Sequence, residues 1–355
     1  MRDRFGREID YMRISVIDSC NLNCYYCNPC DNNEHCHALN ILSVKEVLCI
    51  VRAATRLGIK HFRLTGGEPL LHPQIDEMVS QIKKIPGVRS VSLTTNAVLL
   101  AQHAKWLKEA GIDSINVSLD TIDASEYERI TKKPLLEEVK HGINAAIECG
   151  IRVKINVVLT PQTDVVALTR YVAKKGTDIR FIEMMPVGEG HTNGVEPYKK
   201  VIGTLSKLYG EPCRINTEKT KEINSENDKR KIPDNGPAEY YIFPELGIRV
   251  GLIQAIHGKF CDTCNRIRVT ADGRLMPCLG SSVTMDLVPD SCEFTGDLEK
   301  DFVIVQALRP AIKAKPRCHN FNDNAVTYTK TTETKTTEIE AAEVNAARNM
   351  SRIGG

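Results

Sequence analysis

The chain has 355 residues, and 47 Lys and Arg against 45 Asp and Glu leave a formal net charge of only +2. This near-neutral balance argues against a general nucleic-acid binder or a binder of acidic membranes, and the length suits one large or two medium domains. The charged segment 1–13 lacks the apolar core of a signal peptide, and no apolar run is long enough to span a bilayer. We therefore expect neither a nucleic acid nor a membrane as a partner.

Thirteen cysteines are too few and too unevenly spaced for a disulfide scaffold of this length. Their number is odd, and the six best-organised ones have spacings typical of metal ligands. The cysteine usage therefore predicts a reducing, cytoplasmic compartment.

Short β-branched runs alternate with amphipathic segments from residue 13 to about residue 185. The predicted strands are 13–18, 61–67, 90–96, 114–120, 152–159 and 178–185. A helix is predicted over 43–58, with Ser43 as N-cap and Glu46 three residues later, and another over 135–150. About six β/α units result, which predicts an α/β fold with an incomplete (βα)6 TIM-type barrel.

From about residue 197 the pattern changes. Residues 216–237 are polar and predict a loop, short strands are expected near 240–243 and 248–253, and a helix near 297–313. The Thr-, Lys- and Glu-rich stretch 327–350 is expected to be mobile or weakly helical. We divide the chain into a barrel over 1–195, an α+β region over 196–326 and a tail over 327–355.

A first cysteine triad follows the first predicted strand with the spacing C-x3-C-x2-C: Cys20, Cys24 and Cys27. Three thiolates can hold three irons of a four-iron cluster and leave the fourth iron open for a substrate or cofactor. A structural zinc site, the alternative, would need a fourth ligand. Nearby candidates for that ligand are Cys30, His35, Cys36 and His37.

A second triad has the spacing C-x2-C-x13-C and comprises Cys261, Cys264 and Cys278. The C-x2-C pair alone is a weak signal, since zinc ribbons and redox dithiols share it. Two separate triads, each one ligand short, are harder to explain as structural metal sites, although chance or zinc stays an alternative. We therefore predict two clusters, each with one open metal position.

Polar motifs follow the predicted strands where active sites of parallel β/α folds lie, at the carboxyl ends. GGEP (66–69), TTN (94–96) and SLD (118–120) follow the second, third and fourth strands, and residues 183–185 end the sixth. We expect these motifs and the first triad to form one site.

Together these motifs resemble the radical S-adenosylmethionine (SAM) enzymes, in which an aromatic residue, here Tyr26, precedes the last cysteine of the first triad. A closer resemblance is to the MoaA family of GTP 3′,8-cyclases, which begin molybdenum cofactor biosynthesis. It rests on FGREIDYMRIS, TGGEPLLHP, SLD, RFIEMMPVG, CDTCNRIR and the terminal Gly-Gly, and it covers nearly the whole chain.

The resemblance implies an enzyme, a lyase with two [4Fe–4S] clusters, that binds SAM and GTP. A 5′-deoxyadenosyl radical from SAM would start the conversion of GTP to (8S)-3′,8-cyclo-7,8-dihydroguanosine 5′-triphosphate, while the second cluster faces the guanine. The implied SAM contacts are Tyr26 and Met185 through their backbones, with Gly67 and Ser118. From the residues alone, GGEP could be a simple strand-to-helix turn, Ser118 a buried strand serine and Met185 a core residue.

A triphosphate needs several fixed cations, preferably guanidinium groups. Lys154 lies in the middle of a predicted strand, an unusual place unless it points into a polar cavity. The resemblance implies GTP contacts at Arg13, Arg63, Thr94, Lys154, Arg266 and Arg268, with Arg180 near the site. It also implies catalytic roles for Arg266, Arg268, Gly354 and Gly355. Singly, each base could be solvated or salt-bridged, and the Gly-Gly end could be an ordinary frayed terminus.

Some positions depart from the family pattern. His61 stands where the family usually has Lys, and Ala97 stands where Gly is usual. The loop with Cys30, Cys36 and His37 is also unusual.

Two alternatives are kept: a two-cluster radical SAM enzyme that modifies a peptide, and a non-catalytic zinc module. The arginines of CNRIR and the Gly-Gly end disfavour a peptide substrate, which needs no phosphate clamp. The resemblance further implies a homodimer, a reductant such as flavodoxin or ferredoxin, and a downstream cyclic pyranopterin synthase.

Overall fold

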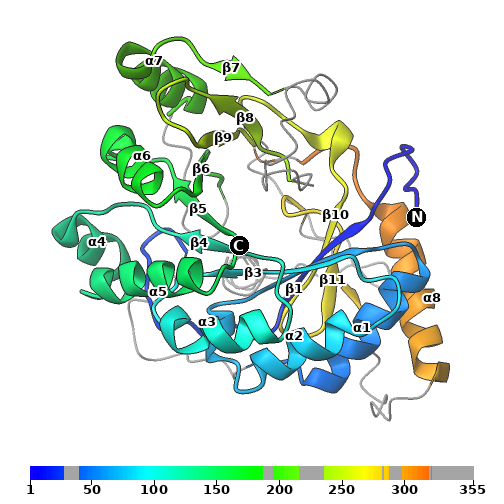
Figure 1. Ribbon diagram of the computed structural model, residues 1–355. Coiled ribbons are helices and arrows are strands. Elements are labelled where there is room, and N and C mark those ends of the chain that lie inside the picture. Colours follow the sequence, from blue (N-terminus) through cyan, green and yellow to red (C-terminus); the bar gives the residue numbers. More distant parts are fainter. Residues whose placement is uncertain are drawn as a thin grey trace, which may run out of the picture.

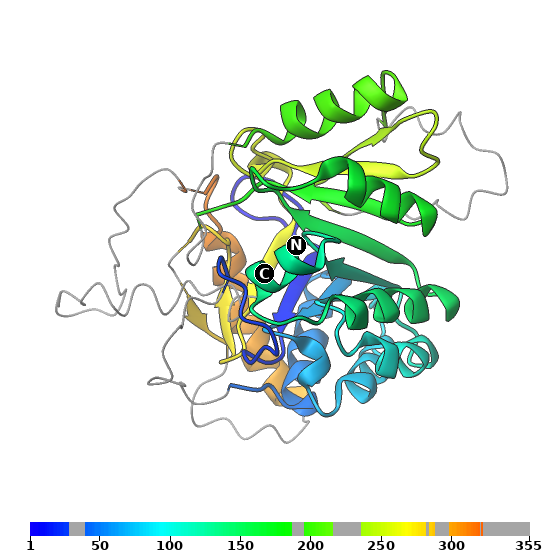
Figure 2. The ribbon, with the colours of Figure 1, turned by 90° about the vertical axis from the view of Figure 1, so that its left-hand side faces the viewer.

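A computed structural model describes residues 1–27, 40–186, 195–215, 236–281, 284–287, 298–319 and 321. Within these residues, twelve strands form one sheet in the order β12-β11-β10-β1-β2-β3-β4-β5-β6-β9-β8-β7. Figure 1 shows that the sheet curves, with helices along its outer side, and Figure 2 shows the same arrangement from the side.

The six predicted β/α units form the middle of this sheet. Its parallel strands are β1 (Tyr11–Ser15), β2 (His61–Thr65), β3 (Ser90–Thr95), β4 (Ser114–Ser118), β5 (Val153–Val158) and β6 (Asp178–Ile182). The helices outside it are α1 (Val44–Arg56), α2 (Ile75–Lys83), α3 (Leu100–Glu109), α4 (Ala124–Thr131), α5 (Leu136–Glu148) and α6 (Val165–Lys174). The first strand begins two residues before the predicted 13–18, and a short 3-10 turn, η1 (Pro69–Leu71), follows the GGE of GGEP.

Helix α1 begins as its sequence predicts. The Ser43 hydroxyl accepts a hydrogen bond from the Glu46 backbone N–H, and the Glu46 carboxylate accepts one from the Ser43 N–H at 2.6 Å. This reciprocal capping box satisfies two donors that the first turn of a helix leaves unpaired.

The C-terminal half of the chain extends both edges of the barrel. Strand β9 (Arg249–Ile253) pairs in parallel with β6, and β10 (Arg266–Val269) pairs in parallel with β1. Antiparallel strands continue each edge: β8 (Glu239–Ile242) and β7 (Cys213–Arg214) beside β9, β11 (Arg274–Met276) and β12 (Met285–Asp286) beside β10. Residues 254–265, with the 3-10 turn η3 (Cys261–Thr263), therefore connect one edge of the parallel array to the other.

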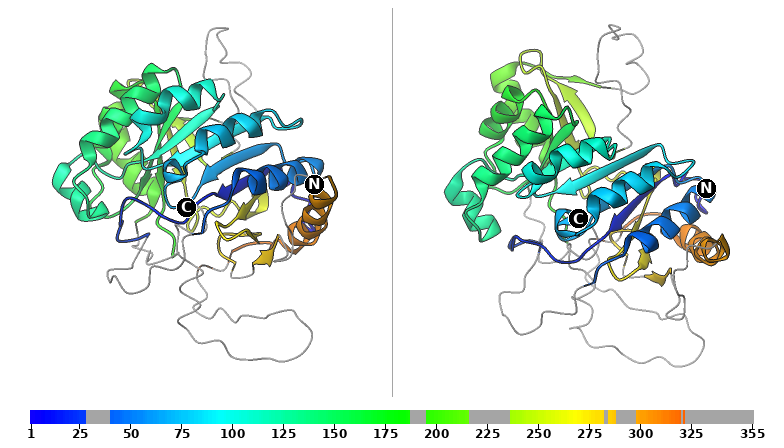
Figure 3. Two further views of the ribbon diagram at one scale, coloured as in Figure 1. Left: turned by 90° about the horizontal axis from the view of Figure 1, so that it is seen from below. Right: turned by 60° about the horizontal axis from the view of Figure 1, so that its bottom comes forward.

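The remaining helical elements are η2 (Tyr198–Ile202), α7 (Gly203–Tyr209) and α8 (Leu298–Ala314). Helix α8 packs beside α1, as both views of Figure 3 show. The fully buried Asp301 of α8 pairs with Arg52 of α1 at 3.0 Å and with Arg56 at 3.5 Å. A buried carboxylate costs free energy unless it is paired, so these contacts fix α8 against α1.

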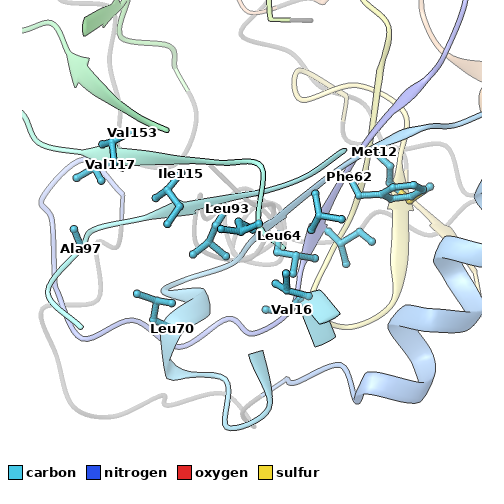
Figure 4. Packing of buried hydrophobic residues seen from close by; sticks show 14 of the residues in the cluster. Met12, Val16, Phe62, Leu64, Leu70, Leu93, Ala97, Ile115, Val117 and Val153 are labelled. Atoms are coloured by element: carbon cyan, nitrogen blue, oxygen red, sulfur yellow. The ribbon is translucent and has the colours of Figure 1, made fainter. Parts of the chain in front are cut away.

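Strand alternation separates the core from the interior of the barrel. Met12 of β1, Phe62 of β2 and Leu93 of β3 are fully buried in the apolar layer shown in Figure 4. Their sequence neighbours, such as Arg13 and Arg63, point to the opposite face because successive side chains of a strand alternate. Within the described residues, no helix combines the length and the apolar character needed to cross a bilayer.

Candidate active site

One cavity of about 310 Å³ opens on the inner face of the sheet. All six triad cysteines line it: Cys20, Cys24, Cys27, Cys261, Cys264 and Cys278. So do the implied SAM and GTP residues Tyr26, Gly67, Ser118, Met185, Arg13, Arg63, Thr94, Arg180, Arg266 and Arg268. The structure thus gathers residues from across the described chain in one chamber.

Strand register places the two triads at opposite ends of the parallel strands. Cys20 follows the carboxyl end of β1. Cys264 comes two residues before Arg266, which pairs with Tyr11, the first residue of β1. Strand β11 runs antiparallel to β10, so Cys278, two residues after it, returns to the same end. The cavity therefore has one triad at each end, and the arginines of β1, β2 and β10 lie between them.

The first triad is enclosed by polar contacts. The Asn96 side-chain amide donates to the Cys20 sulfur at 3.8 Å and to the Asn21 side chain at 2.7 Å. Burial raises the pKa of Cys20 to about 11. Burial, followed by the charge of Cys27, raises the pKa of Cys24 well above its usual range.

Neighbouring thiolates repel one another, so their ionised form is unfavourable in the free protein. A positively charged iron centre would stabilise that ionised form. In the described parts of the chain, no three His, Cys, Asp or Glu side chains are grouped closely enough for a single metal ion. In an iron–sulfur cluster each thiolate binds a different iron, so the three sulfurs need not surround one ion. The residues present therefore fit a cluster.

The glycines of GGEP pack against the backbone that leads to the first triad. A Cβ on Gly67 would lie 2.0 Å from the Ser19 carbonyl oxygen, and one on Gly66 would lie 2.2 Å from that of Ile17. The Gly67 N–H also donates to the Ile17 carbonyl at 2.8 Å. The volume that a Cβ would need at either position is therefore occupied by the backbone of residues 17–19.

Glu68 of the same motif links three segments. Its carboxylate accepts hydrogen bonds from the Thr95 hydroxyl and the Asn96 N–H, both at 2.7 Å, and from the Leu70 N–H at 3.0 Å. Burial raises its pKa to about 7. Because Asn96 also contacts Cys20, Glu68 joins GGEP, the TTN turn and the triad, a role that the motif itself could have suggested.

Asp120, the last residue of SLD, is a second carboxylate of the site, and no role for its side chain was predicted from the sequence. It accepts hydrogen bonds from the Tyr26 hydroxyl at 2.5 Å and from the Val158 N–H at 2.7 Å. Burial raises its pKa to about 6. Its neighbour Ser118 is exposed to the cavity, so the alternative of a buried strand serine is wrong, and Asp120 fixes the Tyr26 ring beside the triad.

Guanidinium groups crowd the wall between the triads. Arg13 pairs in register with Arg268 on one side and with Arg63 on the other. Burial, and then the charge of Arg268, lowers the pKa of Arg13 well below its usual range. Burial and the charge of Arg266 lower the pKa of Arg268 to about 10.

Tyr11 lies within this arginine cluster. The Arg63 Nε donates to its hydroxyl at 2.5 Å. Burial acts to raise the Tyr11 pKa, but the charges of Arg63 and Arg13 outweigh it and the pKa falls. Of the described residues that line the cavity, the carboxylates are Asp120 and Glu183, too few to balance the cations, so the wall is suited to a polyanion.

Arg180 occupies the opposite wall. Its Nη2 donates to the Asn116 side chain at 2.8 Å, and its Nε is buried with no hydrogen bond. A Cβ on Gly251 would lie 2.7 Å from the Arg180 Cγ, so this glycine of β9 makes the room that Arg180 occupies.

Lys154 and the two departures from the family pattern, His61 and Ala97, are not among the described residues that line the cavity. Lys154 is buried on the strand face that it shares with Asn156. His61 shares a hydrogen bond with the Ser90 hydroxyl at 2.7 Å. Ala97 has φ of 67°, in the left-handed region that favours glycine, which accounts for glycine being usual there.

The second triad is anchored to the N-terminal segment and to β6. The Arg7 Nη1 donates to the Cys261 carbonyl at 2.8 Å, and Asp3 holds the Arg7 Nε at 2.6 Å. The Glu183 carboxylate accepts hydrogen bonds from the Ile256 N–H at 2.7 Å and from the His257 N–H at 3.1 Å. These contacts fix the 254–265 connection. Arg7 lies in FGREIDYMRIS and Glu183 in RFIEMMPVG, but the sequence assigned no role to either side chain.

Some predicted residues lie outside the described part of the chain. They are Gly354, Gly355, Cys30, His35, Cys36 and His37.

Comparison with known proteins gives two matching families. The Radical SAM superfamily matches residues 14–167, and the family described as Molybdenum Cofactor Synthesis C matches residues 177–321. Among solved structures, that of Streptococcus suis SuiB bound to the precursor peptide SuiA is similar with a TM-score of 0.58, at 16% identity, covering 87% of this chain and 67% of that one. At this identity the likeness shows the fold, a radical SAM barrel as predicted.

Relatives in sequence are closer. A GTP 3′,8-cyclase of Clostridium perfringens is 35% identical over 324 residues, which is 90% of this chain and 95% of the relative. A GTP 3′,8-cyclase of Pelotomaculum thermopropionicum is 36% identical over 324 residues, 90% of this chain and 95% of the relative. This identity over almost the full length confirms the resemblance predicted from the two triads and GGEP: the chain belongs to the GTP 3′,8-cyclase family of the radical SAM superfamily.

Proposed function

We propose that the chain converts GTP to (8S)-3′,8-cyclo-7,8-dihydroguanosine 5′-triphosphate, the first step of molybdenum cofactor biosynthesis. The observation that carries this proposal is the single cavity that both triads line, with arginines from β1, β2 and β10 between them. The relatives named GTP 3′,8-cyclase support it.

The first triad would hold a [4Fe–4S] cluster, and Tyr26, Gly67, Ser118 and Met185 would hold SAM beside it. The reduced cluster and SAM together supply a 5′-deoxyadenosyl radical. The chain's part is to position and to exclude water: Asp120 fixes Tyr26, and Glu68 and Asn96 fix the triad loop.

The second triad, Cys261, Cys264 and Cys278, would hold a second [4Fe–4S] cluster, whose open iron would bind the guanine. Its place at the opposite end of the strands supports this role, because a substrate between the triads would present different atoms to each. We propose that Gly354 and Gly355 reach the same site and contribute to catalysis. Their deletion, which should abolish cyclisation but not folding, tests this.

The triphosphate would bind the arginine cluster. Arg13, Arg63 and Arg268 lie side by side on three strands, and Arg266 lies two residues before Arg268 on the same strand face. Buried guanidinium groups that lower one another's pKa favour a ligand of several negative charges. Thr94, 3.4 Å from the Arg63 Nη1, as well as Lys154 and Arg180, are proposed as further GTP contacts.

The same cluster favours GTP as the substrate over the alternatives. A peptide-modifying enzyme has no use for four arginines on one wall, and a zinc module needs no such cavity. We further propose a barrel unit over 1–195 and a second unit over 196–326, a cytoplasmic homodimer, a flavodoxin or ferredoxin reductant and a cyclic pyranopterin synthase that takes the product.

Anaerobic reconstitution followed by incubation with GTP, SAM and a strong reductant tests the function. About eight irons per chain, two four-iron clusters, are expected. Chromatography followed by mass analysis should find a nucleotide that is separated from GTP but has the same mass, and 5′-deoxyadenosine beside it. A chain that holds stoichiometric zinc without sulfide, or that cleaves SAM but leaves GTP unchanged, would contradict the proposal.

A further inference from the structure

A buried lysine links the segments that carry two ligands of the second triad. Lys315, directly after α8, is 2% exposed, and its Nζ donates to the Arg266 carbonyl at 2.7 Å and to the Pro277 carbonyl at 2.8 Å. Arg266 begins β10 two residues after Cys264, and Pro277 directly precedes Cys278. One ammonium group thus fixes the spacing of the two strands on which these cysteines depend.

Cys264 also lies close enough to this ammonium to be affected by its positive charge. None of the ion pairs among the described residues includes Lys315, and the hydrogen bonds that its Nζ donates go to two carbonyls rather than to a carboxylate. A buried ammonium without a counter-charge is costly, and it favours an anionic partner at the same place. A cluster bound by thiolates is such a partner.

The residues that follow Lys315 hold it in place. Arg7 donates to the carbonyls of Pro316 at 2.6 Å and Arg317 at 2.9 Å, as well as to that of Cys261. The His319 ring shares a hydrogen bond with the Ala255 carbonyl at 2.8 Å. Segment 315–319 therefore contacts the chain beside Cys264 and Cys278 and is joined through Arg7 to Cys261, which gives the ammonium little freedom to move away from Cys264.

We propose that Lys315 is a positioning residue of the second cluster, holding Cys264 and Cys278 in their binding arrangement and stabilising the reduced, more negative state of the cluster by its fixed charge. This inference rests on the proposed second cluster.

The test compares Lys315→Met, Lys315→Gln and Lys315→Arg with Lys313→Met, a matched control because Lys313 is an exposed lysine near the end of the same helix. Each is made in a Cys24→Ser background, so that the second cluster alone gives the spectroscopic signal. The ratio of reduced to oxidised cluster is measured by electron paramagnetic resonance at a fixed potential. The rate of iron loss to a chelator is measured on the same samples.

We expect Lys315→Met and Lys315→Gln to lower the reduced-to-oxidised ratio at least tenfold, which is about 59 mV for one electron. Iron loss should quicken by a similar factor, while Lys315→Arg and Lys313→Met stay within about threefold of the parent. Parent-like ratios and iron loss in both neutral variants would overturn the inference.

Two further measurements distinguish a failure of the Lys315 inference from a failure of the proposed second cluster. With Cys24 intact, the Lys315 variants should still release 5′-deoxyadenosine from SAM, which shows that the barrel is folded. Lys315→Gln can still donate one of the carbonyl hydrogen bonds. If Lys315→Met does not fold, the cluster reduction and iron loss of Lys315→Gln alone test the inference. A parent protein with only about four irons would overturn the second cluster and the role of Lys315 together. About eight irons with indifferent Lys315 variants would overturn the role of Lys315 alone.

Discussion

Arg13 and Arg268 lie at paired positions on the neighbouring parallel strands β1 and β10. Residues from opposite ends of the sequence thus bring two buried guanidinium groups onto one face. Burial and the charge of Arg268 lower the pKa of Arg13, and burial and the charge of Arg266 lower the pKa of Arg268. Such an arrangement is unfavourable in the empty protein and favourable when a polyanion binds, which makes its removal informative.

Arg268→Met should weaken GTP binding and leave the free protein at least as stable as the parent. The lost charge-assisted contact is worth about 1.5–3 kcal/mol, or about 10- to 150-fold in Kd, whereas the free protein loses repulsion between like charges. Titration calorimetry with GTP and thermal unfolding of the free protein measure the two effects.

Arg274→Met is the matched control, because Arg274 lies on the adjacent strand with a side chain 54% exposed. It should bind GTP like the parent. An Arg268→Met protein with an unchanged Kd would remove the arginine wall from the substrate site.

Gly67→Ala should disrupt the first triad. The added Cβ would meet the Ser19 carbonyl at 2.0 Å, and backbone cannot yield as a flexible side chain can. We expect a loss of more than about 2 kcal/mol in the free energy of unfolding and a clear fall in iron content after reconstitution. Gly203→Ala at the start of α7, where nothing lies within 4 Å, should change neither. Full iron content in Gly67→Ala would contradict the prediction, because it would show that the backbone around Ser19 can move to accommodate the added Cβ.

Asp120 should make the metal-free protein less stable as pH rises from about 4 to 6. Burial raises its pKa from 3.8 to about 6, so the folded state holds a proton there that the unfolded state has lost. Stability falls with pH wherever the folded state binds more protons, and above pH 6 this contribution becomes constant.

Asp120→Asn removes that titration and keeps groups able to bond Val158 and Tyr26. Its melting temperature relative to the parent should therefore rise between pH 4 and 6.5 and then level off. Asp286→Asn, at an exposed carboxylate, serves as the control. Parallel melting curves for Asp120→Asn and the parent would show that Asp120 does not titrate in this range.

The two triads should be separable by mutation. Cys24→Ser should abolish 5′-deoxyadenosine release, because the cleavage of SAM depends on the first cluster. Cys264→Ser should still cleave SAM but form no cyclic nucleotide. Chromatography of both products in one reaction checks this, and normal product from Cys264→Ser would refute the role of the second triad.

Much of the fold was predictable because its signals are local. The six β/α units follow from strand runs and capping residues such as Ser43 and Glu46, and the structure places each unit within a few residues of its prediction. The first triad was recognisable by spacing, since its three cysteines lie within eight residues of one loop, whereas Cys278 of the second triad is separated from Cys264 by β10 and β11. Alternation likewise assigned Arg266 and Arg268 to one face of a strand.

The contacts that complete the site depend on chain segments far apart in sequence. No local pattern shows that β9 and β10 join opposite edges of the barrel, which puts Cys264 at the end of the strands opposite to Cys20. Asp120 and Lys315 act through partners more than thirty residues away. Strand pairing and burial are decided by the packing of the whole sheet, and only that packing turns scattered charges into one chamber with a triad at each end.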